Sequence, residues 1–130
     1  MKKLIGFVVV GAMGLTLIIG ATAASARTAA PGAVIRTGHC TGPSTWKLTL
    51  KHDNGRIESD LEVQTPASGQ TWHYVMKDNG IRFAAGNKVT MADGSFSVTR
   101  FAPNALGTDQ IVARANNLTT GEVCRAAAAI

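Results

Sequence analysis

Hydrophobic and polar residues alternate along most of the chain after Cys40. The clearest stretch runs from Trp46 to Val63, where apolar residues occupy every second position for much of the way on both sides of an Asn54-Gly55 pair. A period of two is typical of strands with one buried face. Asn-Gly favours a type I′ turn, because both central residues of that turn need positive φ. The pattern therefore predicts a β-hairpin with a two-residue turn at Asn54-Gly55.

The charges of this hairpin select the same register as its hydrophobic residues. A two-residue turn places Lys51 opposite Glu58 and Lys47 opposite Glu62 on the outer face. Opposite charges and apolar pairs directly across a sheet both stabilise it, and a slip of one residue would turn the apolar set towards solvent. The apolar pairs that this register brings to the inner face are Trp46 with Val63 and Leu48 with Leu61.

A second alternating stretch, from Trp72 to Lys77, leads into the turn sequence Asp78-Asn79-Gly80. A two-residue turn here would place Lys77 opposite Arg82, which is a like-charge pair, so we expect a longer, bulged turn. The return strand is expected to be weak, because Ala84-Ala85-Gly86 interrupts it. We interpret the residues on the other face of the first strand as core rather than as an aromatic ligand platform; they are Trp72, Tyr74 and Met76.

Further strands are predicted after the Asp93-Gly94 turn, from Ile111 to Asn116, and around Val123-Cys124. Phe101 falls out of phase with Phe96 and Val98, which predicts a bulge or strand end near Arg100. With about seven short strands, frequent turn signals and no helical period after the first residues, the sequence predicts an all-β fold. We expect an antiparallel immunoglobulin-like β-sandwich.

The first 26 residues have the pattern of a secretory signal peptide. Lys2 and Lys3 precede the apolar run Leu4–Ile19, and the small-residue site Ala24-Ser25-Ala26 follows. The run of about 16 residues is shorter than the roughly 20 of a membrane-spanning helix, which disfavours an uncleaved anchor. We therefore expect a secreted protein with these segments: signal peptide 1–26, extended leader 27–39, β-sandwich domain 40–126, and a C-terminal tail 127–130 without a partner.

Export changes the interpretation of the two cysteines. Outside the cytoplasm, Cys40 and Cys124 are expected to form a disulfide between the first and last strands. The alternative is a catalytic thiol in the pair His39-Cys40. We disfavour it, because it requires a reduced cysteine with an activated thiolate.

Charge argues against several classes of partner. Loss of Lys2 and Lys3 with the signal lowers the formal net charge from +5 to +3, which is mild for 11 basic and 8 acidic residues. The sequence therefore predicts no nucleic-acid partner and no membrane binding by the mature form. We expect a monomer with an unidentified extracellular or cell-envelope partner.

The sequence predicts no metal site, no cofactor and no catalytic residue. No two histidines have the spacing of metal ligands, and a blue-copper site would need histidine and methionine soon after Cys124. We interpret the carboxylates Glu58, Asp60 and Glu62 as a solvated sheet face paired with lysines, not as a glycosidase pair across a cleft. No serine has a nucleophile signature.

A resemblance supports the fold. The turn and core positions that carry it are Trp46 through Gly55, Gly69-Gln70-Thr71-Trp72, Gly94 to Val98, Gly107-Thr108-Asp109, Arg114-Ala115-Asn116 and Thr120 to Cys124. Over about residues 40–126 the chain resembles a group of small secreted proteins of high-GC Gram-positive bacteria. This resemblance implies an immunoglobulin-like or fibronectin-like sandwich with one terminal disulfide. It supplies no catalytic or binding residues.

These observations favour a non-enzymatic secreted module with an extracellular or envelope-associated binding or structural role. The binding role is inferred from fold analogy alone, and one fold can host many functions. The alternative is an inhibitor of a secreted protease that presents an exposed loop, either Thr65–Gln70 or Ala102–Asp109. A small hydrolase ranks third.

Overall fold

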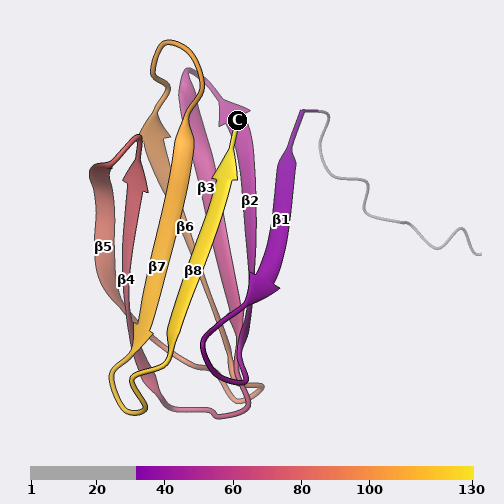
Figure 1. Ribbon diagram of the computed structural model, residues 1–130, viewed down its shortest axis with the longest axis vertical. Coiled ribbons are helices and arrows are strands. Elements are labelled where there is room, and N and C mark those ends of the chain that lie inside the picture. The colour runs from indigo at the N-terminus through magenta and orange to yellow at the C-terminus, as the bar shows by residue number, and fades with distance from the viewer. Residues whose placement is uncertain (1–31) are drawn as a thin grey trace, which may run out of the picture.

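The computed structural model describes residues 32–130, and these residues form two packed antiparallel β-sheets without a helix (Figure 1). The predicted all-β antiparallel sandwich is confirmed, with eight strands where about seven were expected. The strands are β1 (Val34–His39), β2 (Thr45–Asp53), β3 (Arg56–Gln64), β4 (Thr71–Asp78), β5 (Ile81–Val89), β6 (Ser95–Pro103), β7 (Gln110–Asn117) and β8 (Val123–Ala129).

The first sheet, sheet A, has the strand order β1-β2-β3-β6, and the second, sheet B, has the order β5-β4-β7-β8. The chain crosses between the sheets after β3, β5 and β6. As a result β3 pairs with β6 in one sheet while β4 pairs with β7 in the other. Sheet B thus has the arrangement that the C, F and G strands with an added C′ have in immunoglobulin domains.

The predicted signal peptide lies outside the described residues, as does the part of the expected leader before residue 32. Among residues 32–130, no helix has the length and apolar character needed to cross a membrane.

The β2–β3 hairpin has the predicted register. Lys47 lies opposite Glu62 and Lys51 opposite Glu58, and both pairs form ion pairs, with N–O distances of 3.7 and 3.4 Å. Asn54 has a φ of 50°, as the first central position of a type I′ turn requires. The apolar pairs are those expected, Trp46 with Val63 and Leu48 with Leu61.

The expectation of a longer turn between β4 and β5 is wrong. Asp78 lies opposite Ile81 and Lys77 opposite Arg82, so the turn has two residues. Asn79 and Gly80 both have positive φ, of 48° and 82°, and this local geometry outweighs a repulsion between exposed charges that costs only tenths of a kcal/mol, about 0.2–1. A register shift does occur, but one step later, between Met76 and Lys77.

The return strand β5 is also stronger than expected, since it runs unbroken for nine residues. Its small residues make room for a core side chain. A Cβ atom on Gly86 would lie 2.9 Å from the hydroxyl of Tyr74, which is too close for an unshifted contact. The missing side chain of Gly86 therefore leaves room for the Tyr74 hydroxyl at the sheet edge, and the strand continues through this glycine.

The bulge or strand end expected near Arg100 is absent from β6. The strand keeps one register against β3 through Pro103, with Arg100 opposite Ser59, so Arg100 occupies an inward position and Phe101 an outward one. Arg100 lies at the sheet edge, where its guanidinium donates to the Tyr74 hydroxyl at 2.7 Å. Phe101 is 39% exposed and lies under the guanidinium of Arg56, 4.2 Å from its ring centroid.

The expected leader and tail both contribute to the sheets. Residues 34–39 form β1, which pairs with β2 along its whole length, and residues 127–129 continue β8 against β7. The sandwich therefore extends from residue 34 to residue 129, beyond the predicted bounds 40–126. Main-chain pairing accounts for both differences, because Val34 to His39 and Ala127 to Ala129 have weak alternation and give no sequence signal.

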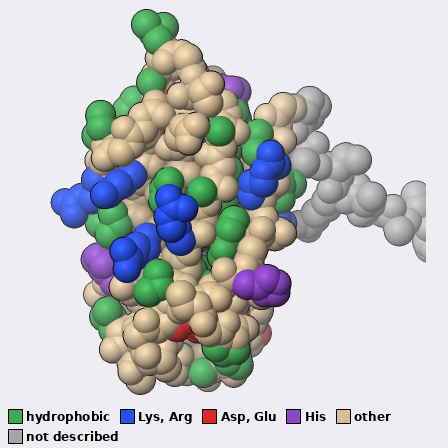
Figure 2. All heavy atoms as spheres, viewed as in Figure 1, with side chains coloured by type: hydrophobic (Ala, Val, Ile, Leu, Met, Phe, Trp, Pro, Cys, Tyr) green, Lys and Arg blue, Asp and Glu red, His purple; other side chains and the backbone are tan. Residues whose placement is uncertain are grey.

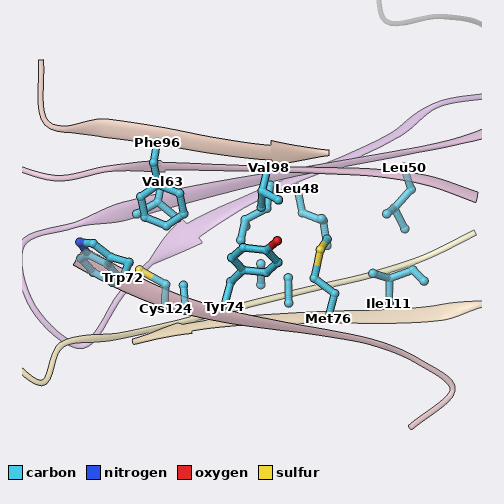
Figure 3. Packing of buried hydrophobic residues seen from close by; sticks show 14 of the residues in the cluster. Leu48, Leu50, Val63, Trp72, Tyr74, Met76, Phe96, Val98, Ile111 and Cys124 are labelled. Atoms are coloured by element: carbon cyan, nitrogen blue, oxygen red, sulfur yellow. The ribbon is translucent and has the colours of Figure 1, made fainter. Parts of the chain in front are cut away.

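The core lies between the sheets and is built from the inward residues of both (Figure 3). The predicted core face of β4 is confirmed, because Trp72, Tyr74 and Met76 are at most 2% exposed. The Trp72 ring packs on Phe96 of sheet A with ring centroids 5.7 Å apart. The other labelled core residues are Leu48, Leu50, Val63, Val98, Ile111 and Cys124.

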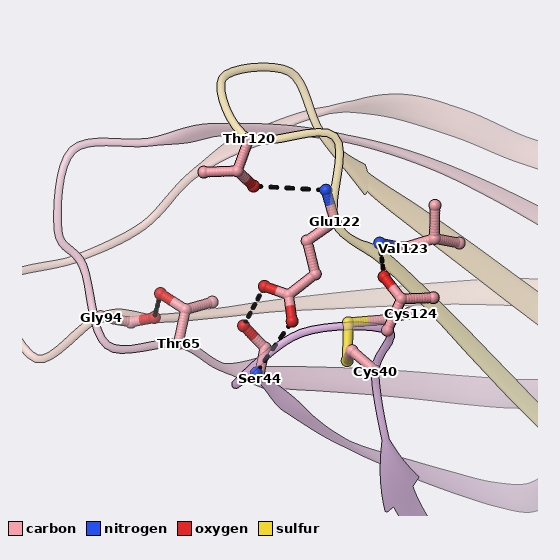
Figure 4. The surroundings of a disulfide bond; sticks show 9 residues. Cys40, Ser44, Thr65, Gly94, Thr120, Glu122, Val123 and Cys124 are labelled. Atoms are coloured by element: carbon pink, nitrogen blue, oxygen red, sulfur yellow. Dashed lines mark hydrogen bonds between the residues drawn. A yellow bond between two sulfur atoms is a disulfide. The ribbon is translucent and has the colours of Figure 1, made fainter.

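The predicted disulfide between Cys40 and Cys124 is present and joins the residue that follows β1 to β8 (Figure 4). Hydrogen bonds reinforce this junction. The Glu122 carboxylate accepts from the Ser44 amide and hydroxyl at 2.9 and 2.7 Å, and the Val123 amide donates to the Thr41 hydroxyl at 2.9 Å. A disulfide of this kind is compatible with an extracellular protein.

Reduction of the disulfide should lower the stability of the sandwich. The bond closes a loop between residues 84 positions apart, which in the chain-entropy model stabilises the fold by about 4.5 kcal/mol. We expect the melting temperature to fall by more than about 10 °C in reductant. A Cys40→Ser, Cys124→Ser variant should melt at the lower temperature with or without reductant. Equal melting of the wild type in both buffers would contradict this account.

Exchange of the charges in the outer pair of β2 and β3 should restore stability lost by either single reversal. Lys47→Glu and Glu62→Lys each create a like-charge pair, whereas the double variant recreates an opposite-charge pair. We expect a coupling free energy of about 0.2–1 kcal/mol in urea unfolding at low salt. Strictly additive effects of the two substitutions would argue against the interaction.

Candidate functional site

Four cations gather on the outer side of sheet B, away from the core. They come from all four strands of the sheet: Lys77, Arg82, Arg114 and Arg125. All four are exposed, and cross-strand pairing places them on one side of the sheet, because residues directly opposite share a face. We call these four residues the basic face. Figure 2 views the molecule from this side and shows blue side chains over the middle of the sheet with no red among them.

Pairs of like charge lie directly opposite each other on the basic face. Lys77 faces Arg82 across β4 and β5, and Arg114 faces Arg125 across β7 and β8. Such pairs destabilise a sheet, because Cβ atoms at these positions are only about 4.5–5.5 Å apart. The arrangement therefore concentrates positive charge at some loss of stability.

Among residues 32–130, no acidic side chain forms an ion pair with the basic face. Glu58, Asp60 and Glu62 lie on β3 in the other sheet, while Asp78 and Asp109 are buried. None of the three ion pairs found among residues 32–130 involves the basic face. Of the remaining acidic residues, Asp53 ends β2 in sheet A, and Asp93 and Glu122 lie in the connections before β6 and β8.

The outer side of sheet A has the opposite character, because its charges are paired. As predicted, Glu58 and Glu62 of β3 face lysines of β2, whereas Asp60 faces Thr49 instead of a lysine. Asp60 accepts a hydrogen bond from the Thr99 hydroxyl at 3.2 Å. Partial burial, and to a smaller extent the charge of Glu62, raise the pKa of Asp60.

The cations of the basic face have donors available for a ligand. Arg114 uses its Nε to donate to the Asn116 side chain at 3.2 Å, which orients the guanidinium. Its two terminal nitrogens form no hydrogen bond within residues 32–130. A guanidinium held in this way presents paired donors, which match the oxygens of a phosphate or a carboxylate.

A concavity of about 640 Å³ lies over one end of sheet A. Its charged groups are engaged with each other or with the backbone. Glu62 pairs with Lys47 at 3.7 Å, and Asp93 accepts from the Ser95 amide and hydroxyl at 2.9 and 2.6 Å. These hydrogen bonds lower the pKa of Asp93. We therefore place the candidate site on sheet B.

The residues that the sequence singled out do not converge on one site. His39 lies at the end of β1 and His52 near the end of β2, whereas His73 lies on β4 and contacts Asn87 at 2.8 Å. Within residues 32–130, no group of three or more His, Cys, Asp and Glu side chains is arranged to hold a metal ion.

Neither a protein-family model, nor a curated protein sequence, nor a solved structure matches the chain. The basic face was missed in the sequence because its members are spread from Lys77 to Arg125, and the net charge of the chain is small. A usable signal existed: on β4, β5, β7 and β8, four basic residues and no acidic residue occupy the outward phase of the alternation.

Conversion of one like-charge pair into an opposite pair should stabilise the sandwich. We expect Lys77→Glu to raise the free energy of unfolding by about 0.5 kcal/mol at low salt, and the gain to shrink in 1 M NaCl. Urea unfolding measures this effect. The control is Lys77→Glu with Arg82→Glu, which recreates a like-charge pair and should lose the gain; equal stabilisation by both variants would contradict the argument.

Proposed function

We propose that the chain is an exported, non-enzymatic immunoglobulin-like module whose basic face binds an anionic polymer of the cell envelope or the extracellular medium. The signal-peptide pattern of residues 1–26 supports export, and the Cys40–Cys124 disulfide is compatible with it. The resemblance to small secreted proteins of high-GC Gram-positive bacteria points to the same location.

The observation that carries this proposal is the pair of like-charge cross-strand contacts on the basic face. The same chain neutralises the outer side of sheet A with ion pairs, so unpaired charge on sheet B is not a general property of its surface. An anionic partner supplies the missing countercharge. The formal net charge of +3 expected for the mature chain understates this attraction, because the opposite charges lie on the other sheet or in the interior.

The chemistry of the face favours phosphate-bearing or carboxylate-bearing polymers. Three of its four members are arginines, and arginine binds both anions through parallel hydrogen bonds. Because the charges are exposed, binding should depend strongly on salt. Nucleic acid is not the partner that we propose, since it is not the abundant polyanion of an envelope surface.

Binding to isolated cell walls of the producing organism tests the proposal. We expect sedimentation of the protein with the walls at 50 mM NaCl and its release at 500 mM. Arg114→Glu with Arg125→Glu should weaken binding at least tenfold. The matched control, Lys47→Glu with Lys51→Glu, changes the net charge equally on sheet A and should retain binding. Equal loss by both variants, or binding that salt does not affect, would contradict a specific role of the basic face.

A second candidate, the protease inhibitor, is favoured by the β6–β7 loop. Leu106 at this loop is 103% exposed, and the loop protrudes at one end of the sandwich (Figure 1). The Thr65–Gln70 loop is less suited, because its backbone is bonded to Thr90 and Gly94. Inhibition assays with secreted proteases would detect this activity, and Leu106→Glu should abolish it.

A further inference from the structure

Two rows of polar side chains, which we call the polar rows, cross all four strands of sheet A and line the concavity at its end. Neighbouring strands lie about 4.8 Å apart and alternate residues of a strand about 7 Å apart, so the rows cover roughly 14 by 7 Å of the outer side of the sheet. Cross-strand pairing fixes both rows: the first is Thr37, Lys47, Glu62 and Ser97, and the second is His39, Thr45, Gln64 and Ser95.

The connection between β5 and β6 borders the concavity and is held firmly against β3. The Gly94 amide donates to the Met91 carbonyl at 2.9 Å, and the Thr65 amide donates to the Gly94 carbonyl at 2.9 Å. The side-chain amide of Gln64 donates to the carbonyl of Asp93 at 2.7 Å. A Cβ atom on Gly94 would clash with the carbonyl oxygen of Thr65. The shape of the concavity is therefore set by the fold, as is usual for small-molecule sites, and its volume of about 640 Å³ is in their range.

The charged groups of the concavity offer no strong countercharge to an ionic ligand. Lys47 and Glu62 form an ion pair at 3.7 Å, so their charges offset each other. Asp93 accepts hydrogen bonds from the Ser95 amide and hydroxyl at 2.9 and 2.6 Å. A neutral ligand suits these surroundings better than an anion or a cation does.

Hydrogen-bonding groups remain available along the polar rows. The exposed hydroxyls of Thr37 and Ser97 lie at the two ends of the first row, and the ammonium of Lys47 and the carboxylate of Glu62 lie between them. Thr45 adds an exposed hydroxyl from the second row. Ammonium groups donate, carboxylates accept and hydroxyls do both. A ligand with several neighbouring hydroxyl groups matches this mixture, because each of its hydroxyls also donates and accepts.

We propose that the polar rows bind a neutral saccharide that lies across the strands of sheet A. Met91, which borders the concavity and is 57% exposed, offers apolar surface to the C–H groups of a sugar ring. An extended peptide fits less well, because peptides that add to a sheet pair with a free edge, whereas the polar rows lie on a face. The inference does not rest on the proposed role of the basic face, which lies on the other sheet.

Titration of the ¹⁵N-labelled protein with cellotetraose and chitotetraose, which are both neutral, tests the site. We expect at least one of them to move the amide resonances of Thr37, Thr45, Gln64 and Ser97 and to leave those of β7 and β8 unchanged. The Kd should be about 1 mM, because hydrogen bonds exchanged with water each contribute little. It should be the same at 50 and 500 mM NaCl, unlike binding to the basic face.

Three results of this titration would overturn the proposal. The first is the absence of shifts with both saccharides at ten times the expected Kd. The second is a salt-dependent change centred on β7 and β8, which would place the saccharide on the basic face. The third is a response of the polar rows to a neutral hexapeptide of serine and glycine but to neither saccharide, which would assign the concavity to peptides.

Variants that remove single hydroxyls separate this site from the rest of the surface. Thr45→Val and Ser97→Ala should each weaken saccharide binding at least threefold. The matched control is Thr49→Val, on the same strand and the same outer side but outside the concavity, and it should keep the wild-type Kd. Arg114→Glu with Arg125→Glu should also keep it, so that failure of the basic face and failure of this site are distinguishable. Equal Kd values for Thr45→Val and Thr49→Val would overturn the proposal.

Discussion

The fold depends on the requirement that every strand delivers alternate side chains to a layer shared by two sheets. Apolar residues meet this requirement at most inward positions, from Leu48 to Ala126. The inward positions that hold charged side chains are the informative exceptions. Arg100 lies at a sheet edge, where its side chain reaches solvent and donates to the Tyr74 hydroxyl. Asp78 and Asp109, in contrast, are buried near a strand end. A charged residue at an inward position breaks the alternation of apolar and polar residues, and core packing alone does not explain why it is there.

The alternation made much of the fold predictable, and its failures have physical causes. The Trp46–Val63 hairpin was predictable to the residue, because turn, charge and apolar pattern agree on one register. The β4–β5 turn was not, since we gave the repulsion of Lys77 and Arg82 more weight than the positive φ of Asn79. The first edge strand, β1, and the C-terminal part of β8 were missed, because main-chain hydrogen bonds hold them and such bonds leave little trace in residue type.

Candidate sites were harder to predict than the fold, because they arise from pairing between distant strands. Arg114 and Arg125 become neighbours only through the register of β7 and β8, and Asp78 meets Asp109 only through β4 and β7. The amino-acid composition gives the total charge and does not show which charged residues lie next to each other. A chain of small net charge can thus hold one sheet face with ion pairs, one basic sheet face and two buried aspartates.

The position of the disulfide has a consequence for truncated chains. Cys124 belongs to β8, the last strand of the chain to be synthesised, and its partner precedes β2. In the folded domain the bond joins the two ends of a segment that contains the six strands β2 to β7. A chain truncated before β8 lacks Cys124 and leaves the thiol of Cys40 without its partner, so a thiol-reactive probe distinguishes the truncated chain from the full one.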